Sequence, residues 1–201
     1  MLPVKSKYKI GKRLGVGVFE QLQTQKFALS EARFRNRKET RRRTGSDYGR
    51  QLLEKQRLRY TYGIAERQLS NYAKKASDTA DPSLALYRAL EFRADSVIYR
   101  SGLAPTRRAA RQMVSHGHIT VNGRRITTPS YMTHVGSLLS VREGSRRKAL
   151  FASAGEEEEH KNPPQWLTVD RALLQVTVVA EPVLTEGQGI DYSTVFEFYS
   201  R

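Results

Sequence analysis

Cysteine is absent from this chain of 201 residues. Its absence excludes disulfide bonds and thiolate metal sites. The sequence also contains no apolar run close to the roughly 18 residues that a membrane-spanning helix needs, and no secretory signal follows Met1. We therefore expect neither a disulfide framework nor insertion into a membrane.

Acidic residues are scarce over the first three quarters of the chain. Residues 1–150 contain 32 Lys and Arg but 11 Asp and Glu, whereas residues 151–201 contain 3 and 9, and the net charge is +15. Arg outnumbers Lys by 24 to 11, and a planar guanidinium donates to phosphate oxygens in pairs and stacks on bases. The composition predicts a polyanionic partner, and the Arg bias suits structured RNA.

Residues 103–126, LAPTRRAARQMVSHGHITVNGRRI, join a basic helix to a tight hairpin. Thr106 can cap the helix, and Gly117 can end it in the left-handed conformation, so we predict a helix over residues 107–116. An apolar stripe at i, i+3 and i+4 spacing gives this helix one side for packing; it consists of Ala110, Met113 and Val114.

The other side of this helix is polar and basic. A positive charge in a first helical turn opposes the helix dipole and costs roughly 0.3 to 1 kcal/mol when exposed. Arg107 and Arg108 are therefore poorly placed for stability alone, and an RNA phosphate near that turn would reverse the sign. A solvated charged face is the usual meaning of such a cluster, but the dipole mismatch favours RNA contact.

β-Structure is predicted after the basic helix. Alternating β-formers over residues 119–126 flank Asn122-Gly123, the dipeptide that best fits a type I′ hairpin turn. A second strand pattern occupies residues 137–142. Before the basic helix, apolar residues keep helical spacing from Leu86 to Gly102. This spacing predicts one helix that packs beneath the basic helix and the hairpin.

The rest of the chain divides by composition. Residues 1–45 are basic and weakly periodic, which indicates an extended or partly helical arm. Residues 46–88 are predicted to form a helical domain, in which Gly63 separates two helices. Residues 151–161 include four consecutive glutamates and are expected to be a solvated linker.

The tail, residues 162–201, is rich in apolar residues that it cannot bury alone, such as Trp166 and Val176–Val179. We expect it to return and complete the helical domain, so that a module over residues 89–150 is inserted. The predicted fold class is α+β: a mostly helical N-terminal domain with a small α/β RNA-binding module of two helices and a short antiparallel sheet.

Motifs along the whole chain resemble the S-four family, named after the fourth protein of the small ribosomal subunit. The segment from about Leu90 to Arg147 resembles the RNA-binding domain of that family. Because cysteine is absent, the chain looks like the cysteine-free form, including the plastid type. The matching motifs are Ser46-Asp47-Tyr48-Gly49, Glu54-Lys55-Gln56-Arg57-Leu58-Arg59, Tyr62-Gly63-Ile64-Ala65-Glu66-Arg67-Gln68-Leu69, Ala104-Pro105-Thr106-Arg107, Ser115-His116-Gly117-His118-Ile119, Val121-Asn122-Gly123 and Glu197-Phe198-Tyr199-Ser200-Arg201.

The resemblance implies a structural constituent of the small ribosomal subunit with no cofactor and no small-molecule substrate. Such a protein binds 16S rRNA directly at a junction of several helices in the 5′ domain, nucleates subunit assembly and supports translational accuracy. The implied partners are 16S rRNA and other small-subunit proteins, notably the S-five protein. The implied location is the cytoplasmic ribosome, and a plastid host stays open.

Two alternatives share the same module: an RNA-modifying enzyme and a ribosome-associated quality-control factor. The remaining sequence has no Gly-rich phosphate loop and no nucleophile with a plausible base. His116 and His118 lack a third metal ligand at a convincing spacing, and the run Glu156–Glu159 lacks pre-formed geometry for a cation. We therefore predict neither catalytic nor metal-binding residues.

Some residues in these motifs have a structural explanation. Tyr60 and Tyr62 could stack on bases, but we expect them to pack in the core. Arg93 and Asp95 are expected to form an ion pair. The residues predicted to bind RNA are Arg41, Arg42, Arg43, Arg50, Lys55, Arg57, Arg59, Arg93, Thr106, Arg107, Arg108, Arg111, Gln112, Ser115, His116, His118, Asn122, Arg124 and Arg125.

Overall fold

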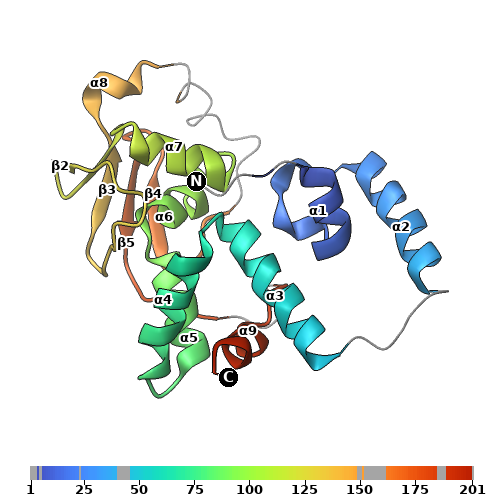
Figure 1. Ribbon diagram of the computed structural model, residues 1–201. Coiled ribbons are helices and arrows are strands. Elements are labelled where there is room, and N and C mark those ends of the chain that lie inside the picture. Colours follow the sequence, from blue (N-terminus) through green and yellow to red (C-terminus); the bar gives the residue numbers. More distant parts are fainter. Residues whose placement is uncertain are drawn as a thin grey trace. The chain divides into compact units, whose positions relative to one another are not determined.

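The structure is a computed structural model and consists of two compact units (Figure 1). Unit 1 comprises Met1–Leu86 and Leu184–Arg201, and unit 2 comprises Tyr87–Val183. We call them the helical unit and the module. The structure describes residues 4, 6–22, 24–39, 46–148, 151, 162–184 and 189–200.

The N-terminal region of the helical unit is folded over most of its described residues. Its elements are α1 (Lys7–Leu14), η1 (Val16–Val18), η2 (Glu20–Leu22) and α2 (Gln25–Glu39). Leu14, Val18, Leu22 and Phe27 are buried. The region expected to be an extended or partly helical arm therefore contributes apolar residues to a core, which its weak periodicity did not indicate.

Two predicted helices follow, α3 (Asp47–Tyr62) and α4 (Glu66–Ser77). The Ser46 hydroxyl accepts a hydrogen bond from the Gly49 N–H at 3.2 Å and caps α3. Gly63, with φ of 61°, ends α3 in the left-handed conformation. The predicted separation of two helices at Gly63 is confirmed.

The C-terminal helix α9 (Tyr192–Tyr199) packs against α3 within the helical unit. The hydroxyls of Tyr62 and Tyr192 lie 3.0 Å apart in the buried contact, and the Gln51 amide donates to Glu197 at 3.0 Å. Tyr62 is thus a core residue, as expected. Tyr60 is half-buried, with its ring edge-on to Phe19 at 6.2 Å.

The module contains two helices packed on an antiparallel sheet. Figure 1 shows α6 and α7 beside the sheet, and apolar residues of both helices share one core with its strands. The strand order is β2-β1-β3-β5-β4. The elements are α5 (Pro82–Glu91, where the units divide), α6 (Ala94–Arg100), α7 (Arg107–Ser115), β1 (Ile119–Val121), β2 (Arg124–Arg125), β3 (Leu138–Val141), α8 (Glu143–Arg146), β4 (Leu167–Asp170) and β5 (Gln175–Val178).

The basic helix and the hairpin form as predicted. The Thr106 hydroxyl accepts from the Ala109 N–H at 3.1 Å, and Gly117 follows the helix with φ of 68°. Asn122 and Gly123 have φ of 49° and 80°, the two positive values that a type I′ turn requires. Local cap and turn chemistry therefore specifies this part of the module, and the α+β fold class is confirmed.

The tail contributes two strands to the module instead of joining the helical unit throughout. β5 pairs with β3, and Leu139 lies opposite Val176; β4 then pairs with β5. The alternating residues Val176 and Val178 are fully buried in the core of the sheet. The expectation that residues 162–183 pack on the N-terminal helices is wrong, because their apolar face extends this sheet.

The predicted single helix from Leu86 to Gly102 is also wrong, because it is interrupted between α5 and α6. Arg93 has an extended backbone and forms an isolated bridge with Met132. The Ala94 N–H donates to the Tyr131 carbonyl at 2.9 Å, and the Thr133 N–H donates to the Phe92 carbonyl at 2.8 Å. Hydrogen bonds with this distant loop replace the helical ones.

The expected linker begins with a buried residue. Phe151 is 3% exposed and belongs to the core of the module, so the chain is anchored there. Residues 152–161, which include the four glutamates, lie outside the described residues.

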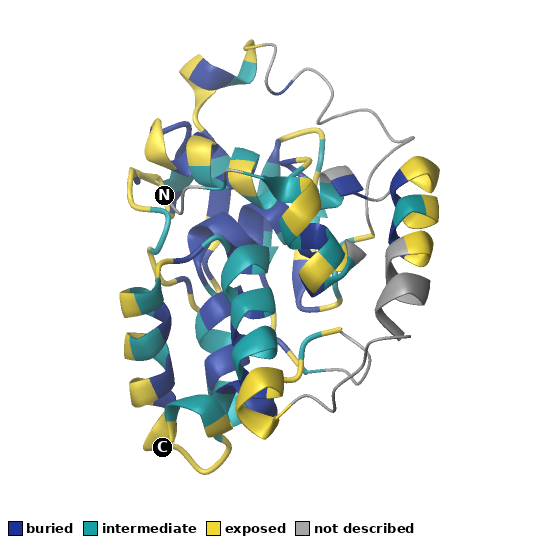
Figure 2. Cartoon of the chain, turned by 45° about the vertical axis from the view of Figure 1, so that its right-hand side comes forward, coloured by how far each residue is buried: buried dark blue, intermediate teal, exposed yellow. Residues whose placement is uncertain are grey.

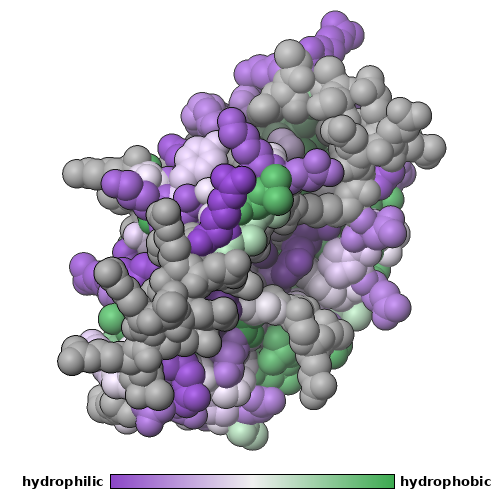
Figure 3. Space-filling view, turned by 90° about the vertical axis from the view of Figure 1, so that its right-hand side faces the viewer, coloured by the Kyte–Doolittle hydropathy of each residue, from purple (hydrophilic) through white to green (hydrophobic). Residues whose placement is uncertain are grey.

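The helices of this chain, in which 27% of the residues are charged, have a buried side and an exposed side. Figure 2 shows helices with buried residues along one side and exposed residues along the opposite side. Hydrophilic side chains dominate the described residues on the face in Figure 3, where hydrophobic ones form only small patches. Among the described helices, each is too short or too polar to cross a lipid bilayer.

Candidate nucleic-acid interface

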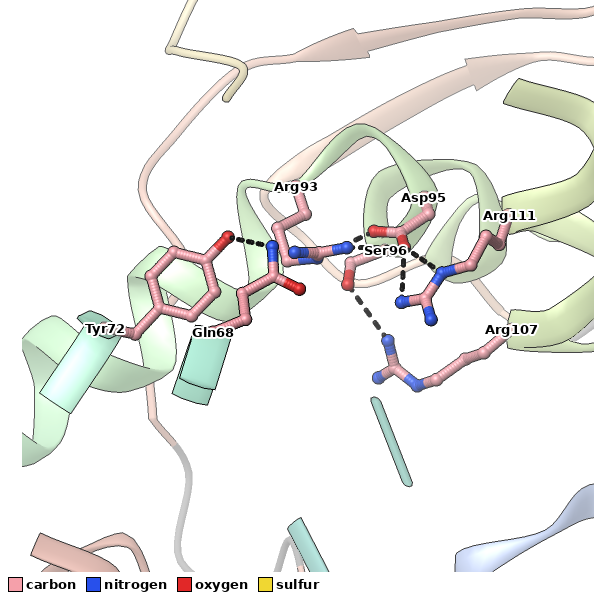
Figure 4. A network of polar contacts seen from close by, with 7 residues as sticks. All are labelled: Gln68, Tyr72, Arg93, Asp95, Ser96, Arg107 and Arg111. Atoms are coloured by element: carbon pink, nitrogen blue, oxygen red, sulfur yellow. Dashed lines mark hydrogen bonds and ion pairs between the residues drawn. The ribbon is translucent and has the colours of Figure 1, made fainter. Parts of the chain in front are cut away.

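Asp95 lies between two arginines in the module (Figure 4). Arg93 donates from Nε and a terminal nitrogen to the two carboxylate oxygens, at 2.9 and 2.8 Å. Arg111 from α7 donates to Oδ2 of the same carboxylate at 2.9 and 2.8 Å. Arg93 is 2% exposed, so the structure does not present it at the surface. The expected Arg93–Asp95 ion pair is confirmed.

Glu91 forms a second buried carboxylate site beside the first. Arg100 donates to its two oxygens at 2.8 and 2.7 Å, and Arg107 reaches it at 3.3 Å. Arg107 also donates to the Ser96 hydroxyl at 3.2 Å and lies over the Tyr99 ring, 4.6 Å from its centroid. We call Arg93, Arg100, Arg107 and Arg111, with Glu91 and Asp95, the paired-arginine cluster.

The paired-arginine cluster fastens α7 to α6. The side chains of Arg107 and Arg111 are 12% and 14% exposed, and both guanidinium groups already bind carboxylates. A buried carboxylate that lost such partners would be an uncompensated charge. These two predicted RNA-binding residues therefore act first as internal ties between helices.

The predicted residues in α3 are also engaged within the protein. Lys55 is buried, donates to Glu66 at 2.9 Å and lies 4.0 Å from the centroid of the Phe198 ring. Arg59 donates to the same Glu66 at 3.0 Å. Arg57 donates to the Leu14 carbonyl at 2.8 Å and, at the same distance, to Glu54. These three cations hold the helical unit together.

The electrostatics of Glu66 agree with that role. Burial alone would raise the pKa of its carboxyl, but hydrogen bonds from Lys55 and Tyr199 and the charges of Lys55 and Arg59 hold the pKa below its ordinary value. Tyr199 donates to Glu66 at 2.7 Å, and burial followed by this bond raises the pKa of its hydroxyl. The carboxylate is therefore ionised and links α3, α4 and α9.

Arg50 is the exposed member of the α3 set. Its side chain is 68% exposed and lies 3.5 Å from Asp47, which is itself exposed. Such a surface pair contributes little to stability, and Arg50 is free to exchange its partner for a phosphate. The arm cluster Arg41–Arg43 lies outside the described residues.

The remaining predicted residues of the module divide into structural and exposed ones. Thr106 caps α7, and the Asn122 side-chain carbonyl accepts from the Leu138 N–H at 2.8 Å, which ties the hairpin to β3. Apart from the buried His118, the other residues are exposed, and none of them pairs with a carboxylate among the residues that the structure describes. We call this set the basic face: Arg108, Gln112, Ser115, His116, Arg124 and Arg125.

The basic face has an ordered arrangement. Arg108, Gln112 and Ser115 are spaced i, i+4 and i+7, so they follow one side of α7 to its C-terminal end. There Arg125 donates to the His116 carbonyl at 3.4 Å. A Cβ on Gly117 would meet the Arg125 guanidinium at 2.2 to 2.7 Å. Gly117 therefore ends the helix and leaves room for Arg125, whose charge suits the negative end of the helix dipole.

His118 is the buried neighbour of the basic face. Its Nδ1 lies 3.0 Å from the Ser145 hydroxyl, and its ring is edge-on to Phe151 at 6.1 Å. Burial is the main cause that lowers the pKa of His118, and nearby positive charges lower it further. These charges come from Lys148, His116, Arg142 and Arg125. His118 therefore favours the neutral form and joins α8 to the module.

Sequence analysis missed part of this positively charged region. Arg142, Arg147 and Lys148 are exposed, and two of them act electrostatically on His118. Their signal in the sequence is Arg142 at the end of the predicted strand, followed within a few residues by the short basic run Arg146-Arg147-Lys148. Among the described residues there is no group of three or more His, Asp or Glu that could hold a metal ion.

Comparison with known proteins identifies the family. Residues 4–91 match the Ribosomal protein S4/S9 N-terminal domain, and residues 92–139 match the S4 domain, the domain that carries the S-four name. The chain is 43% identical to small ribosomal subunit protein uS4 of Roseiflexus sp. (strain RS-1), over 96% of both chains. It is 40% identical to that of Chloroflexus aurantiacus and 37% identical to that of Pediococcus pentosaceus, again over 96% of both chains.

These similarities extend over both units, well beyond a single shared domain. An S4 domain carried by an RNA-modifying enzyme would not bring with it the N-terminal ribosomal domain or such coverage. The chain therefore belongs to the uS4 family of small ribosomal subunit proteins, which are non-enzymatic structural constituents of that subunit.

Proposed function

We propose that the chain binds 16S rRNA directly through the basic face, at a junction of several helices in the 5′ domain. The observation that supports this most is the absence of any carboxylate partner for these exposed cations among the described residues. The carboxylates of the module that do bind arginine include Glu91 and Asp95, which are occupied inside the protein. RNA phosphates would supply the missing anions.

The proposed role follows from the repulsion between RNA helices that converge. Lys and Arg neutralise phosphates that would otherwise repel one another, and a folded protein surface fixes the geometry at which the helices meet. A protein that acts in this way favours the folded junction and so nucleates assembly of the subunit. The same rigidity is our proposed basis for a contribution to translational accuracy.

The proposed location is the cytoplasmic ribosome, with the S-five protein as a neighbour. The membership of the uS4 family and the bacterial relatives support this proposal. A tagged chain should sediment with small subunits in equimolar amount and should crosslink to the S-five protein within them. Recovery of the chain mainly outside ribosomes would contradict this location.

Direct binding is tested with the full chain and a transcript of the 16S 5′ domain in filter-binding assays over a range of salt concentrations. Log affinity falls with log salt. In the Arg108→Gln, Arg124→Gln, Arg125→Gln variant this slope should be less steep by about 2 to 3, since each lost phosphate contact removes roughly 0.7 to 0.9 from its magnitude. A transcript of equal length from the large subunit is the control. Equal affinity for the two transcripts would contradict the proposal.

A further inference from the structure

We infer that the segment Arg142–Lys148, the α8 turn, is a second phosphate-binding element, positioned by the hydrogen bond between His118 and Ser145. The inference rests on the proposed binding of structured RNA and extends it to residues beyond the matched S4 domain, which ends at residue 139. In Figure 1 the helix α8 lies past the end of β3. The expected ligand is the phosphodiester backbone of the bound RNA.

The α8 turn is held firmly for so short a segment. Ser145 is fully buried, and its hydroxyl lies 3.0 Å from Nδ1 of His118. The Arg142 N–H donates to the His118 carbonyl at 2.9 Å, and the Phe151 N–H donates to the Lys148 carbonyl at 2.9 Å. The Phe151 ring is buried against His118. Both ends of the turn are therefore fixed to the core of the module.

The basic residues on this turn outnumber its acidic ones. Arg142, Arg147 and Lys148 are exposed and have no carboxylate partner among the described residues, although the exposed Glu143 lies in the same turn. Arg142 and Lys148 disfavour protonation of His118 in the same way as Arg125 does. The turn thus adds its positive charges to the end of the basic face where Arg125 lies.

This arrangement is better explained by a ligand than by solvation. Like charges that gather around one buried imidazole repel one another, and this repulsion opposes folding unless an anion lies among them. An anion that bridges the basic face and the α8 turn would turn this repulsion into attraction. His118 and Ser145 then act as positioning residues, since neither needs to touch the RNA.

The charges are tested first, in the full chain with the 16S 5′-domain transcript. The Arg142→Gln, Arg147→Gln, Lys148→Gln variant should lower the salt slope by about 2 to 3 if all three cations contact phosphates. The matched control is Arg67→Gln, Lys74→Gln, Lys75→Gln, which removes the same charge from exposed positions of α4. This control should change the slope by less than half as much.

The positioning role is tested with Ser145→Ala in two backgrounds. In the otherwise unchanged chain it should weaken binding on the order of 3- to 10-fold, because the α8 turn loses its fixed place. In the triple α8 variant it should have no further effect on affinity, because no charge is left to position. A loss of the same size in both backgrounds would indicate general destabilisation and would overturn the positioning role.

The outcomes separate this inference from the proposed function. If the unaltered chain binds the 16S and large-subunit transcripts equally, the proposed function itself fails. If it binds the 16S transcript selectively but the triple α8 variant keeps the full salt slope, only the inference fails. It also fails if the α4 control lowers the slope as much as the α8 variant does.

Discussion

The paired-arginine cluster and the basic face both contain arginines, but these arginines have opposite surroundings. Arg93 and Arg111 share one buried carboxylate at distances of 2.8 to 2.9 Å. Arg108 and Arg124, in contrast, are exposed and without an ion-pair partner among the residues that the structure describes. Arginine in this module therefore occurs in two settings, paired with a buried carboxylate or exposed, and we propose a structural role for the first and RNA binding for the second.

The difference also shows why the paired cluster supports the basic face. Arg107 and Arg111 lie on the inner side of α7, while Arg108 and Gln112 lie on its exposed side. The ion pairs fix the helix, and the helix fixes the spacing of the exposed groups. Donors that project from a fixed helix bind an anion without a further loss of backbone freedom. Stability and RNA binding should thus be separable by mutation.

The largest effect on stability is expected for Asp95→Ala. This change removes the carboxylate that Arg93 and Arg111 share, and removal of one partner from a buried pair costs about 3 to 5 kcal/mol. Urea unfolding measures the loss. Glu143→Gln, which removes an exposed carboxylate, should change the free energy of unfolding by about 0.5 kcal/mol or less. An unchanged unfolding midpoint for Asp95→Ala would mean that the buried ion pair does not stabilise the module.

A smaller effect should separate Arg111→Ala from Arg108→Ala. Arg111→Ala removes charged hydrogen bonds but leaves Asp95 paired with Arg93, so we expect a loss of about 1.5 to 3 kcal/mol and an unchanged salt slope for RNA binding. Arg108→Ala should leave stability within about 0.5 kcal/mol and lower the salt slope by roughly 0.7 to 0.9. Unfolding and filter-binding experiments on both variants provide the comparison. If Arg108→Ala lowered stability and Arg111→Ala made the salt slope less steep, Arg108 would be the structural residue and Arg111 the RNA contact.

Features that depend on neighbouring residues could be predicted from the sequence. Thr106 and Gly117 bound α7, Asn122-Gly123 forms the hairpin turn, and Gly63 separates α3 from α4. In each case a cap or a positive φ is set by the residue itself and its immediate neighbours. The family resemblance then supplied the architecture around them.

Features that depend on distant partners could not be predicted in this way. The break before α6 requires the loop around Met132, and the position of β5 requires pairing with β3. The candidate site shows the same limit at the level of side chains. Arg107 and Arg108 are adjacent and chemically identical in the sequence, and only the fold places Glu91 beside one of them.

The smallest expected effect is a pH dependence from His118, at the boundary between core and basic face. Its pKa in the folded chain lies below the ordinary value of 6.5, so the unfolded chain binds more protons near that pH. The contribution to stability is therefore complete above about pH 6.5 and is lost as the pH falls through the folded pKa. Carboxylates titrate at lower pH and also change the free energy of unfolding, so a variant is needed to isolate the contribution of His118.

His118→Gln is such a variant, because an amide can still bond Ser145 but does not titrate. Urea unfolding at several pH values between about 8 and 5 should show a steeper loss of stability in the unaltered chain than in the variant. Positive charges from Lys148, Arg142 and Arg125 contribute to the low pKa, so added 16S 5′-domain transcript should reduce the difference by neutralising them. Identical pH profiles for the chain and the variant would show that His118 titrates alike in the folded and unfolded states.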